Sequence, residues 1–290
     1  MAADLRRRTL LGSALAGVVA ATSSHAAGLD LNDPVQNLLA FAKLTGNSAG
    51  GAVLRWHTGI INAVQPGEKP VPLVGYEGLE KELWASTKEG GPDGSFTTTY
   101  FDIGYFTDLA TGERLRRWTN PITKETLPTM PFRSGRFAAA LKPGAPPRAW
   151  QRRGDDVWVT NRPVVGFPAL LKPELYPAES AGPFQFFSVV RTDRGRLSEV
   201  SDPKVTSAPL SWSYTLTTIW LPWMRMGQRP GAVVWAGNGG KYAAPGDVPE
   251  KFRAFLAEEQ PDYLSADEPL QDVRTMWADY MKANPPADGK

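Results

Sequence analysis

Four polar side chains with aromatic or apolar neighbours are the candidates for acid–base chemistry in this chain. Asp102 and Tyr100 share one face of a strand predicted over residues 96–106, together with two phenylalanines. A carboxylate among such neighbours loses hydration, which raises its pKa towards the range that a general acid or base needs. His57 has an unperturbed pKa close to neutral, and Arg225, between two methionines, could hold a carboxylate or phenolate. The predicted catalytic residues are therefore Asp102, His57, Tyr100 and Arg225.

Each of these residues also has a purely structural explanation. Asp102 could pair with Arg114 or Arg116 on a following strand. Arg225 could stack on a tryptophan ring as a cation–π contact. His57 could be a histidine of the core or of its rim, with its ring nitrogens satisfied by neighbours. The sequence leaves these alternatives open.

The composition excludes several other kinds of catalytic or metal-binding site. The chain has no cysteine, which excludes thiolate nucleophiles, iron–sulfur clusters and cysteine-bound zinc. His57 is the only histidine outside the N-terminal leader described below, so a zinc site with several histidines cannot form within one subunit. Residues 237–240 (Gly-Asn-Gly-Gly) predict a turn and not a phosphate-binding loop, because no helix pattern follows them. We therefore expect neither a metal nor a cofactor.

An aromatic stretch over residues 208–240 must position most of the predicted ligand contacts, since it holds four of the ten tryptophans. Period-two alternation places Trp212, Tyr214 and Trp220 on one face of a strand. One interpretation is the core of an ordinary β-sheet protein. The alternative is that the rings line a cavity for a hydrophobic ligand.

Pro222 cannot donate to a sheet ladder, so this strand is expected to end near it. Residues 228–231 then predict a turn into a second strand over residues 232–236. Three tryptophans gather near the turn of this hairpin, where they could stack a flat ligand. The ligand-binding residues predicted on the hairpin are Trp212, Tyr214, Trp220, Trp223, Met224 and Trp235.

The remaining pattern predicts one mainly β (α+β) domain over residues 27–290. A helix is expected from Pro34 to Gly46, and two helices are expected to close the chain, one with a capping-box-like start around Pro249 and one that begins at Pro269. Segments of strand composition lie between them, at residues 52–63, 96–106, 113–119, 125–130, 148–152, 156–160 and 184–192, while residues 71–84 fit either a strand or a helix. We expect a single antiparallel, meander-rich β-barrel, closed or nearly closed, with flanking N- and C-terminal helices.

Residues 1–26 have the pattern of a twin-arginine export signal. Three consecutive arginines precede a short apolar run, and Ser24-His25-Ala26 resembles a cleavage site. The apolar run is too short for a membrane anchor. Without this leader, Lys+Arg falls from 32 to 29 and Asp+Glu from 30 to 29, so the mature chain is formally neutral. We therefore expect a periplasmic or secreted protein with no stable membrane anchor and no nucleic-acid partner.

Several short motifs resemble a family of bacterial and fungal proteins. They are Gly104-Tyr105-Phe106-Thr107-Asp108, Thr111-Gly112-Glu113, Trp118-Thr119-Asn120-Pro121 with Thr123, the block Trp220-Leu221-Pro222-Trp223-Met224-Arg225-Met226-Gly227, and Arg229-Pro230-Gly231. The family is catalogued as domain of unknown function 1838, and the resemblance extends over roughly residues 38–264. It implies no particular reaction. Its motifs add Trp118, Asn120 and Tyr105 to the predicted ligand-binding residues, and His57 stands where a second aromatic residue is expected.

Two classes of function fit an exported, cysteine-free, aromatic-lined protein. The first is a cofactor-independent lyase, isomerase or hydratase that acts on an aromatic or terpenoid-like small molecule by acid–base chemistry. The second is a non-catalytic periplasmic carrier of the same kind of hydrophobic ligand. A structural module of the cell envelope is disfavoured, since the chain has no repeats. Polar residues such as Asp102 and Arg225 near aromatic surface favour the enzyme.

Overall fold

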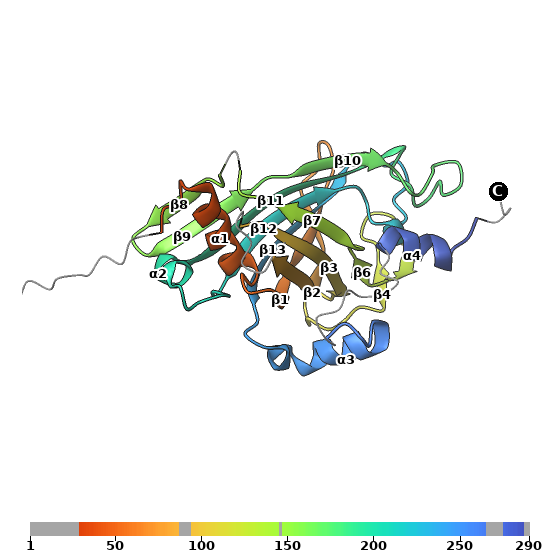
Figure 1. The fold of residues 1–290 in the computed structure, drawn as a ribbon. Helices are drawn as coiled ribbons and strands as arrows, with labels where there is room; N and C mark the ends of the chain where they lie inside the picture. Colours follow the sequence, from red (N-terminus) through yellow and green to blue (C-terminus); the bar gives the residue numbers. More distant parts are fainter. Residues whose placement is uncertain (1–28, 87–93, 145–146, 265–274, 287–290) are drawn as a thin grey trace, which may run out of the picture.

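One antiparallel sheet of eleven strands organises the described part of this computed structural model, which comprises residues 29–86, 94–144, 147–264 and 275–286 (Figure 1). The long strands lie side by side in the order β3 (Phe96–Thr107), β2 (Val71–Ser86), β1 (Gly51–Val64), β13 (Ala232–Lys241), β12 (Ser211–Thr218) and β11 (Phe184–Arg196). Shorter strands extend both edges: β6 (Phe132–Arg133) and β7 (Phe137–Leu141) pair with β3, β9 (Asp156–Asn161) and β10 (Val164–Pro168) pair with β11, and β8 (Trp150–Arg153) pairs with β9. The mainly β, antiparallel prediction is confirmed.

The predicted leader over residues 1–26 lies outside the described residues.

The sheet is open, and the predicted closed barrel is not found. Within the described residues no pairing joins its two edges, which are formed by β6 and β7 on one side and by β8 and β10 on the other. Strand β10 has five residues, follows Pro163 and ends at Pro168. Because proline cannot donate a ladder hydrogen bond, such short, proline-bounded strands terminate a sheet more readily than they close it.

The predicted meander after β3 is found only in part. The chain returns antiparallel as far as Leu115, since Arg114 bridges Thr107 and the backbone N–H of Leu115 donates to the oxygen of Phe106. It then leaves β3 and forms β4 (Arg117–Thr119), which pairs antiparallel with β5 (Thr126–Pro128) in a separate two-stranded sheet. Arg114 and Arg116 bind Glu258 on the helix α3 (Glu250–Glu259), so this segment also contacts the helix.

The aromatic hairpin forms as the alternation predicts. Trp212 on β12 lies opposite Gly239 on β13, and Leu216 lies opposite Trp235. Strand β12 ends at Thr218, and the short 3-10 helix η1 (Pro222–Met224) replaces the last predicted strand residues. Pro222 at the first position of η1 accounts for this end, since its fixed φ suits a helical turn.

The glycines of residues 237–240 belong to β13, so their prediction as a turn is wrong. A Cβ atom at Gly239 would lie 2.3 Å from the indole Nε1 of Trp212, and one at Gly237 would lie 2.1 Å from the hydroxyl of Tyr76. The glycines are therefore required for close approach of aromatic rings to the strand, a use that local composition does not distinguish from a turn.

The helices lie at the periphery of the sheet (Figure 1). Helix α1 (Pro34–Thr45) begins and ends as predicted, with Asp33 accepting from the backbone N–H of Gln36 and Gly46 following the last turn. Helix α4 (Met276–Ala283) carries Trp277, while the predicted start at Pro269 lies outside the described residues. The short helix α2 (Leu197–Ser201) and the 3-10 helix η2 (Pro245–Asp247) complete the described helical elements. None of the described helices has the length and apolar character to cross a membrane.

Candidate functional site

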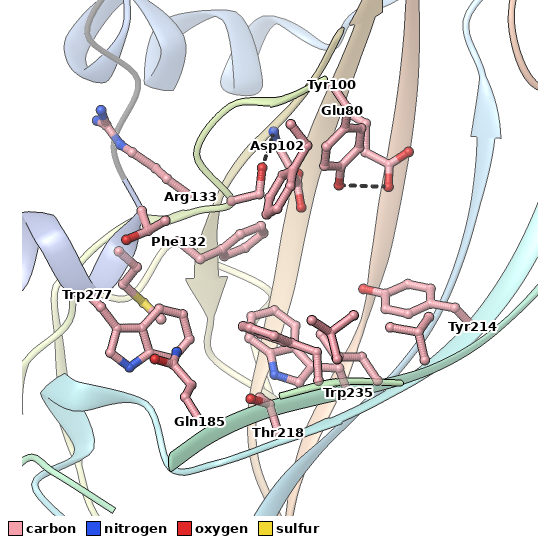
Figure 2. A pocket seen from close by; sticks show the side chains of 18 of the residues that line it. Glu80, Tyr100, Asp102, Phe132, Arg133, Gln185, Tyr214, Thr218, Trp235 and Trp277 are labelled. Carbon is pink, nitrogen blue, oxygen red and sulfur yellow. Dashed lines mark hydrogen bonds between the residues drawn. The ribbon is translucent and has the colours of Figure 1, made fainter. Parts of the chain in front are cut away.

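The sheet curves around a cavity of about 400 Å³, since residues from both of its edges line the same space (Figure 2). Phe137 on β7 and Val165 on β10 contribute from opposite edges, and residues of α4 contribute from one end. The wall is mainly aromatic. Its rings include Phe132, Phe137, Phe187, Trp212, Trp235 and Trp277. The space has the size and the apolar lining of a site for a small hydrophobic molecule.

His57 and Asp102 meet at this cavity although their strands are not neighbours. Strand β2 lies between them, and Gly78 is the residue of β2 opposite His57. A Cβ atom at Gly78 would lie 2.3 Å from Nε2 of His57, so only glycine lets the imidazole cross the strand. Its Nε2 reaches Oδ1 of Asp102 at 3.0 Å. The backbone N–H of Asp102 donates to the hydroxyl of Ser134 at 2.9 Å, which holds the backbone from which the carboxylate extends.

Burial and the interaction between the two side chains shift the pKa values of His57 and Asp102. For His57, burial disfavours the protonated ring, but the charge and the hydrogen bond of Asp102 outweigh it and raise the pKa of His57. Burial also raises the pKa of Asp102, although His57 opposes it. Because the two groups titrate together, the pair keeps a proton to a higher pH than an isolated histidine would.

The second nitrogen of His57 faces Tyr214. Its Nδ1 lies 3.3 Å from the Tyr214 hydroxyl, and the imidazole is surrounded by the rings of Tyr76, Phe132, Trp212 and Tyr214 at centroid distances of 5.6 to 5.9 Å. Burial raises the pKa of Tyr214 well above its ordinary value. Tyr214 therefore stays protonated and is a hydrogen-bond donor on the cavity wall.

A buried ionic network lies beside the pair. Glu80 binds Arg191 at 3.2 Å and Arg55 at 2.8 Å, and Arg191 also donates to Asp193 at 2.8 Å. Burial by itself would raise the pKa of Glu80, but Arg191 and Arg55 outweigh it and lower the pKa to about 2. The hydroxyl of Tyr100 donates to Glu80 at 3.3 Å (Figure 2). The network holds Glu80 charged and fixes Tyr100 at the polar end of the cavity.

Arg191 also connects the network to the aromatic wall. Its guanidinium carbon lies 3.9 Å from the centroid of the Trp212 ring, a cation–π contact. Trp212 in turn stacks on Tyr214, with ring centroids 4.9 Å apart. The orientation of Tyr214 is therefore tied to the ionic network through Trp212.

Six of the predicted site residues come together here. They are Asp102, His57, Tyr100, Trp212, Tyr214 and Trp235. Asp102 pairs with His57, whereas Arg114 and Arg116 bind Glu258. The structural alternative for Asp102, a pair with one of these arginines, is therefore not what the structure shows.

Five other predicted residues lie in the core instead of on the cavity wall, namely Trp118, Asn120, Trp220, Trp223 and Met224. The Trp118 indole donates to the backbone oxygen of Leu73, and the Trp220 indole donates to that of Arg229. The Asn120 amide donates to the backbone oxygen of Met224. Hydrogen bonds of this kind are typical of polar atoms that hold a core together.

Arg225 and Tyr105 also lie elsewhere. Arg225 ends η1 in the left-handed region, with a φ of 50°, and its guanidinium binds Glu179 at 3.1 Å and Glu125 at 3.4 Å on the surface. Tyr105 points to the opposite side of the sheet, as the alternation predicts. It packs on the phenylalanines of α3 and donates its hydroxyl to Glu77 at 2.8 Å.

Sequence reasoning missed Glu80, Arg191 and Gln185 as cavity residues. One signal was available, for Glu80 alone. Arg55 shares a strand face with His57, and an inward-facing arginine requires a buried carboxylate partner. Glu80 was therefore recoverable in principle, whereas Gln185 carries no local signal. Among the described residues, no three His, Cys, Asp or Glu side chains gather in a group that could hold a metal ion.

Comparison with protein families gives one match. A family model described as "Protein of unknown function (DUF1838)" matches residues 50–284, a range that includes every residue lining the cavity. No curated protein matches the chain.

Proposed function

The chain belongs to the DUF1838 family, whose description gives no activity, and we propose from the cavity itself that it is an acid–base enzyme. It binds a hydrophobic, ring-containing small molecule and acts on it as a cofactor-independent lyase, isomerase or hydratase. The observation that carries the proposal is the buried His57–Asp102 pair facing an aromatic cavity. Ionisable groups shifted by burial and by each other are typical of catalytic sites.

Asp102 is the residue of the pair that meets the ligand. Its side chain is 15% exposed, against 3% for His57, and one of its oxygens is held by the imidazole. The other oxygen is therefore the one available to take a proton from the ligand. His57 is a positioning residue, because it acts on the ligand through Asp102 and Tyr214.

Tyr214 supplies the complementary donor. When His57 is protonated, both of its N–H groups donate, one to Asp102 and the other to the hydroxyl oxygen of Tyr214. The Tyr214 O–H then points away from His57 and can donate to an oxygen of the ligand. A ligand carbonyl at this position becomes polarised next to the base.

These roles support a proton transfer within one molecule. In the isomerisation of a β,γ-unsaturated carbonyl ligand, the C–H bond between the carbonyl and the double bond breaks and the Asp102 carboxylate takes the proton. The electron pair forms a dienolate whose oxygen is held by Tyr214, and the proton returns to the γ-carbon, so that the double bond moves next to the carbonyl. The step balances without an oxidant, a reductant or a second substrate.

A carrier is the alternative. The polar residues would then only orient the ligand, and the apolar wall would supply the affinity.

For either function, we propose that residues 1–26 direct export and that the mature protein meets its ligand in the periplasm or outside the cell.

The test combines binding with product analysis. Purified mature protein is screened by tryptophan fluorescence against aromatic carbonyl compounds, terpenoids and fatty acids, and each hit is incubated and examined by mass spectrometry. An enzyme converts a hit, and Asp102→Asn lowers kcat by roughly 10²- to 10⁴-fold. Tyr214→Phe lowers kcat by about tenfold, corresponding to one lost hydrogen bond in the transition state.

Two matched variants serve as controls. Tyr105→Phe removes a buried hydroxyl and Glu77→Gln removes its carboxylate partner, both on the opposite side of the sheet, and neither should change turnover. Binding without conversion of any hit would support the carrier. Full activity in Asp102→Asn would rule out the acid–base role.

A further inference from the structure

Gln185 is a buried polar residue of the cavity that the proposed reaction does not use. The residue is 1% exposed and lines the cavity from β11. Its Oε1 atom is buried without a hydrogen-bond partner among the described residues. Figure 2 shows its amide beside Trp277 and Thr218, away from Glu80 and Tyr100.

The residues near Gln185 do not supply the missing hydrogen-bond donor. The Thr218 hydroxyl already donates to the backbone oxygen of Phe186 at 2.7 Å. Other residues of the cavity wall also have buried donor atoms without an acceptor among the described residues, namely Nε1 of Trp212 and of Trp235 and Nη2 of Arg191. A buried polar atom left unpaired is unfavourable, so these positions indicate a partner that occupies the cavity.

The unpaired atom of Gln185 defines what that partner must carry. An amide oxygen requires a hydrogen-bond donor. A hydroxyl group provides one, whereas an ether or a carbonyl provides only an acceptor. The neutral amide also differs from the charged groups around Glu80, so this part of the cavity is not built for an ion.

We propose that Gln185 forms a second polar position, whose Oε1 accepts a hydrogen bond from a hydroxyl group at the far end of the ligand. This inference rests on the proposed function, because it concerns the same cavity. It narrows the substrate class to an apolar, ring-containing molecule with an oxygen group at each end. One oxygen lies at Asp102 and Tyr214, and the other lies at Gln185.

Pairs of compounds that differ by one hydroxyl test the proposal. The probes are 4-hydroxybiphenyl against 4,4′-dihydroxybiphenyl, and 2-naphthol against 2,6-dihydroxynaphthalene, which give two spacings. Isothermal titration calorimetry on the mature protein should show the better-matched diol binding roughly three- to tenfold more tightly than its monohydroxy partner. Gln185→Leu should abolish this advantage and leave binding of the monohydroxy probe within about twofold.

Stability distinguishes a ligand contact from a structural role. Because Gln185→Leu removes an unpaired buried polar atom, the resistance of the free protein to urea should be unchanged or higher. A loss of stability would mean that the amide supports the fold and would contradict the proposal. Leu216→Met, a volume-conserving change on the same wall, is the matched control and should alter the affinities of both members of a pair equally.

The outcomes separate this inference from the proposed function. If the wild-type protein binds a monohydroxy probe but gains nothing from the second hydroxyl, the second polar position is overturned and the cavity function stands. A diol advantage that persists in Gln185→Leu also overturns it. If no probe binds at all, both the second position and the proposed function fail. The wild-type comparison decides the question even where a variant does not fold.

Discussion

Glu80 holds two arginines at the polar end of the cavity, and its charge determines whether they can remain buried. Its carboxylate forms ion pairs with Arg55 and Arg191 and accepts a hydrogen bond from the hydroxyl of Tyr100. Arg191 also lies over the ring of Trp212, which stacks on Tyr214. Loss of the carboxylate would therefore leave each buried arginine with a single carboxylate partner, Glu82 for Arg55 and Asp193 for Arg191, and would loosen residues on both sides of the His57–Asp102 pair.

We predict that Glu80→Gln destabilises the protein by about 3–5 kcal/mol at pH 7. The pKa of Glu80 is lowered from 4.5 to about 2 in the folded protein, so its contribution is complete above pH 4.5 and is lost as the pH falls from about 4.5 towards 2. The difference between wild type and variant should therefore shrink by on the order of 3 kcal/mol over that window. Urea unfolding at pH 7, 4 and 3 measures it.

The surface carboxylate Glu125 provides the control for this prediction. It binds the half-exposed Arg225, so Glu125→Gln should cost less than about 1 kcal/mol at every pH. A Glu80→Gln penalty that does not change with pH would show that the carboxylate is not charged in the folded protein.

At the level of elements, strand β13 shows how glycine serves the aromatic wall. Its neighbours β1 and β12 bring Trp56 and Trp212 against it, and the backbone at Gly239 leaves the space that these residues occupy. Any side chain there would meet the backbone oxygen of Trp56 at 2.2 Å, and a backbone atom cannot move without shifting its strand. The position of Trp212 on the cavity wall therefore depends on a missing side chain.

We predict that Gly239→Ala destabilises the fold by about 1–3 kcal/mol, in the range for overpacking of a filled core, and weakens ligand binding because Trp212 is displaced. Chemical denaturation and calorimetric titration measure the two effects. The matched change Gly246→Ala meets open space and should alter neither quantity. Unchanged stability and affinity in Gly239→Ala would mean that the wall does not depend on this contact.

Local patterns in the sequence were sufficient for several individual elements, but not for residues 71–86 and 237–240, which are strands that the patterns left ambiguous or predicted as a turn. Alternation along residues 210–220 correctly predicted which side of β12 is aromatic, and Asp33 and Gly46 correctly marked the ends of α1. The arrangement between elements was not accessible in the same way. Residues 113–119 have strand composition, but only Arg114 forms a bridge to β3, and Arg117–Thr119 pair with β5 in a separate sheet.

The candidate site also could not be assembled from local patterns. The sequence predicted His57, Asp102 and Tyr100 as single residues, and the structure brings them to one cavity. Their meeting depends on Gly78, which lies in a different strand and carries no functional group. Arg225 has an equally suggestive neighbourhood of methionines but lies on the surface. A short motif does not distinguish these cases because burial is set by the whole sheet.

For the whole molecule, six of the ten tryptophans belong to the main core, to the cavity wall or to both. Trp118, Trp220 and Trp223 belong to the main core alone, where Trp223 packs on Phe106 and Trp118. Trp212 lines the cavity and packs in a different cluster. Trp235 and Trp277 line the cavity and also belong to the main core. The expectation that Trp220, Trp223 and Trp235 together stack a ligand therefore applies, on this geometry, to Trp235 alone.

We predict opposite effects of two tryptophan substitutions. Trp223→Ala should cost about 3–5 kcal/mol of stability, as for a large core side chain, while the fraction that remains folded binds ligand with a Kd within about twofold of wild type. Trp235→Phe should keep most of the stability, because the ring contacts are largely retained and an unpaired N–H is removed. It should weaken binding of a hydroxylated ligand by roughly threefold or more.

Urea unfolding and calorimetric titration on the same preparations separate the two effects, and Trp223→Phe replaces Trp223→Ala if the alanine variant does not fold. The decisive quantity is the ratio between lost affinity and lost stability for each position. It should be high for Trp235 and low for Trp223, because only the former lies on the cavity wall. The reverse order would place the ligand near η1 and not in the cavity, and the roles assigned to Asp102, Tyr214 and Gln185 would then have no ligand to act on.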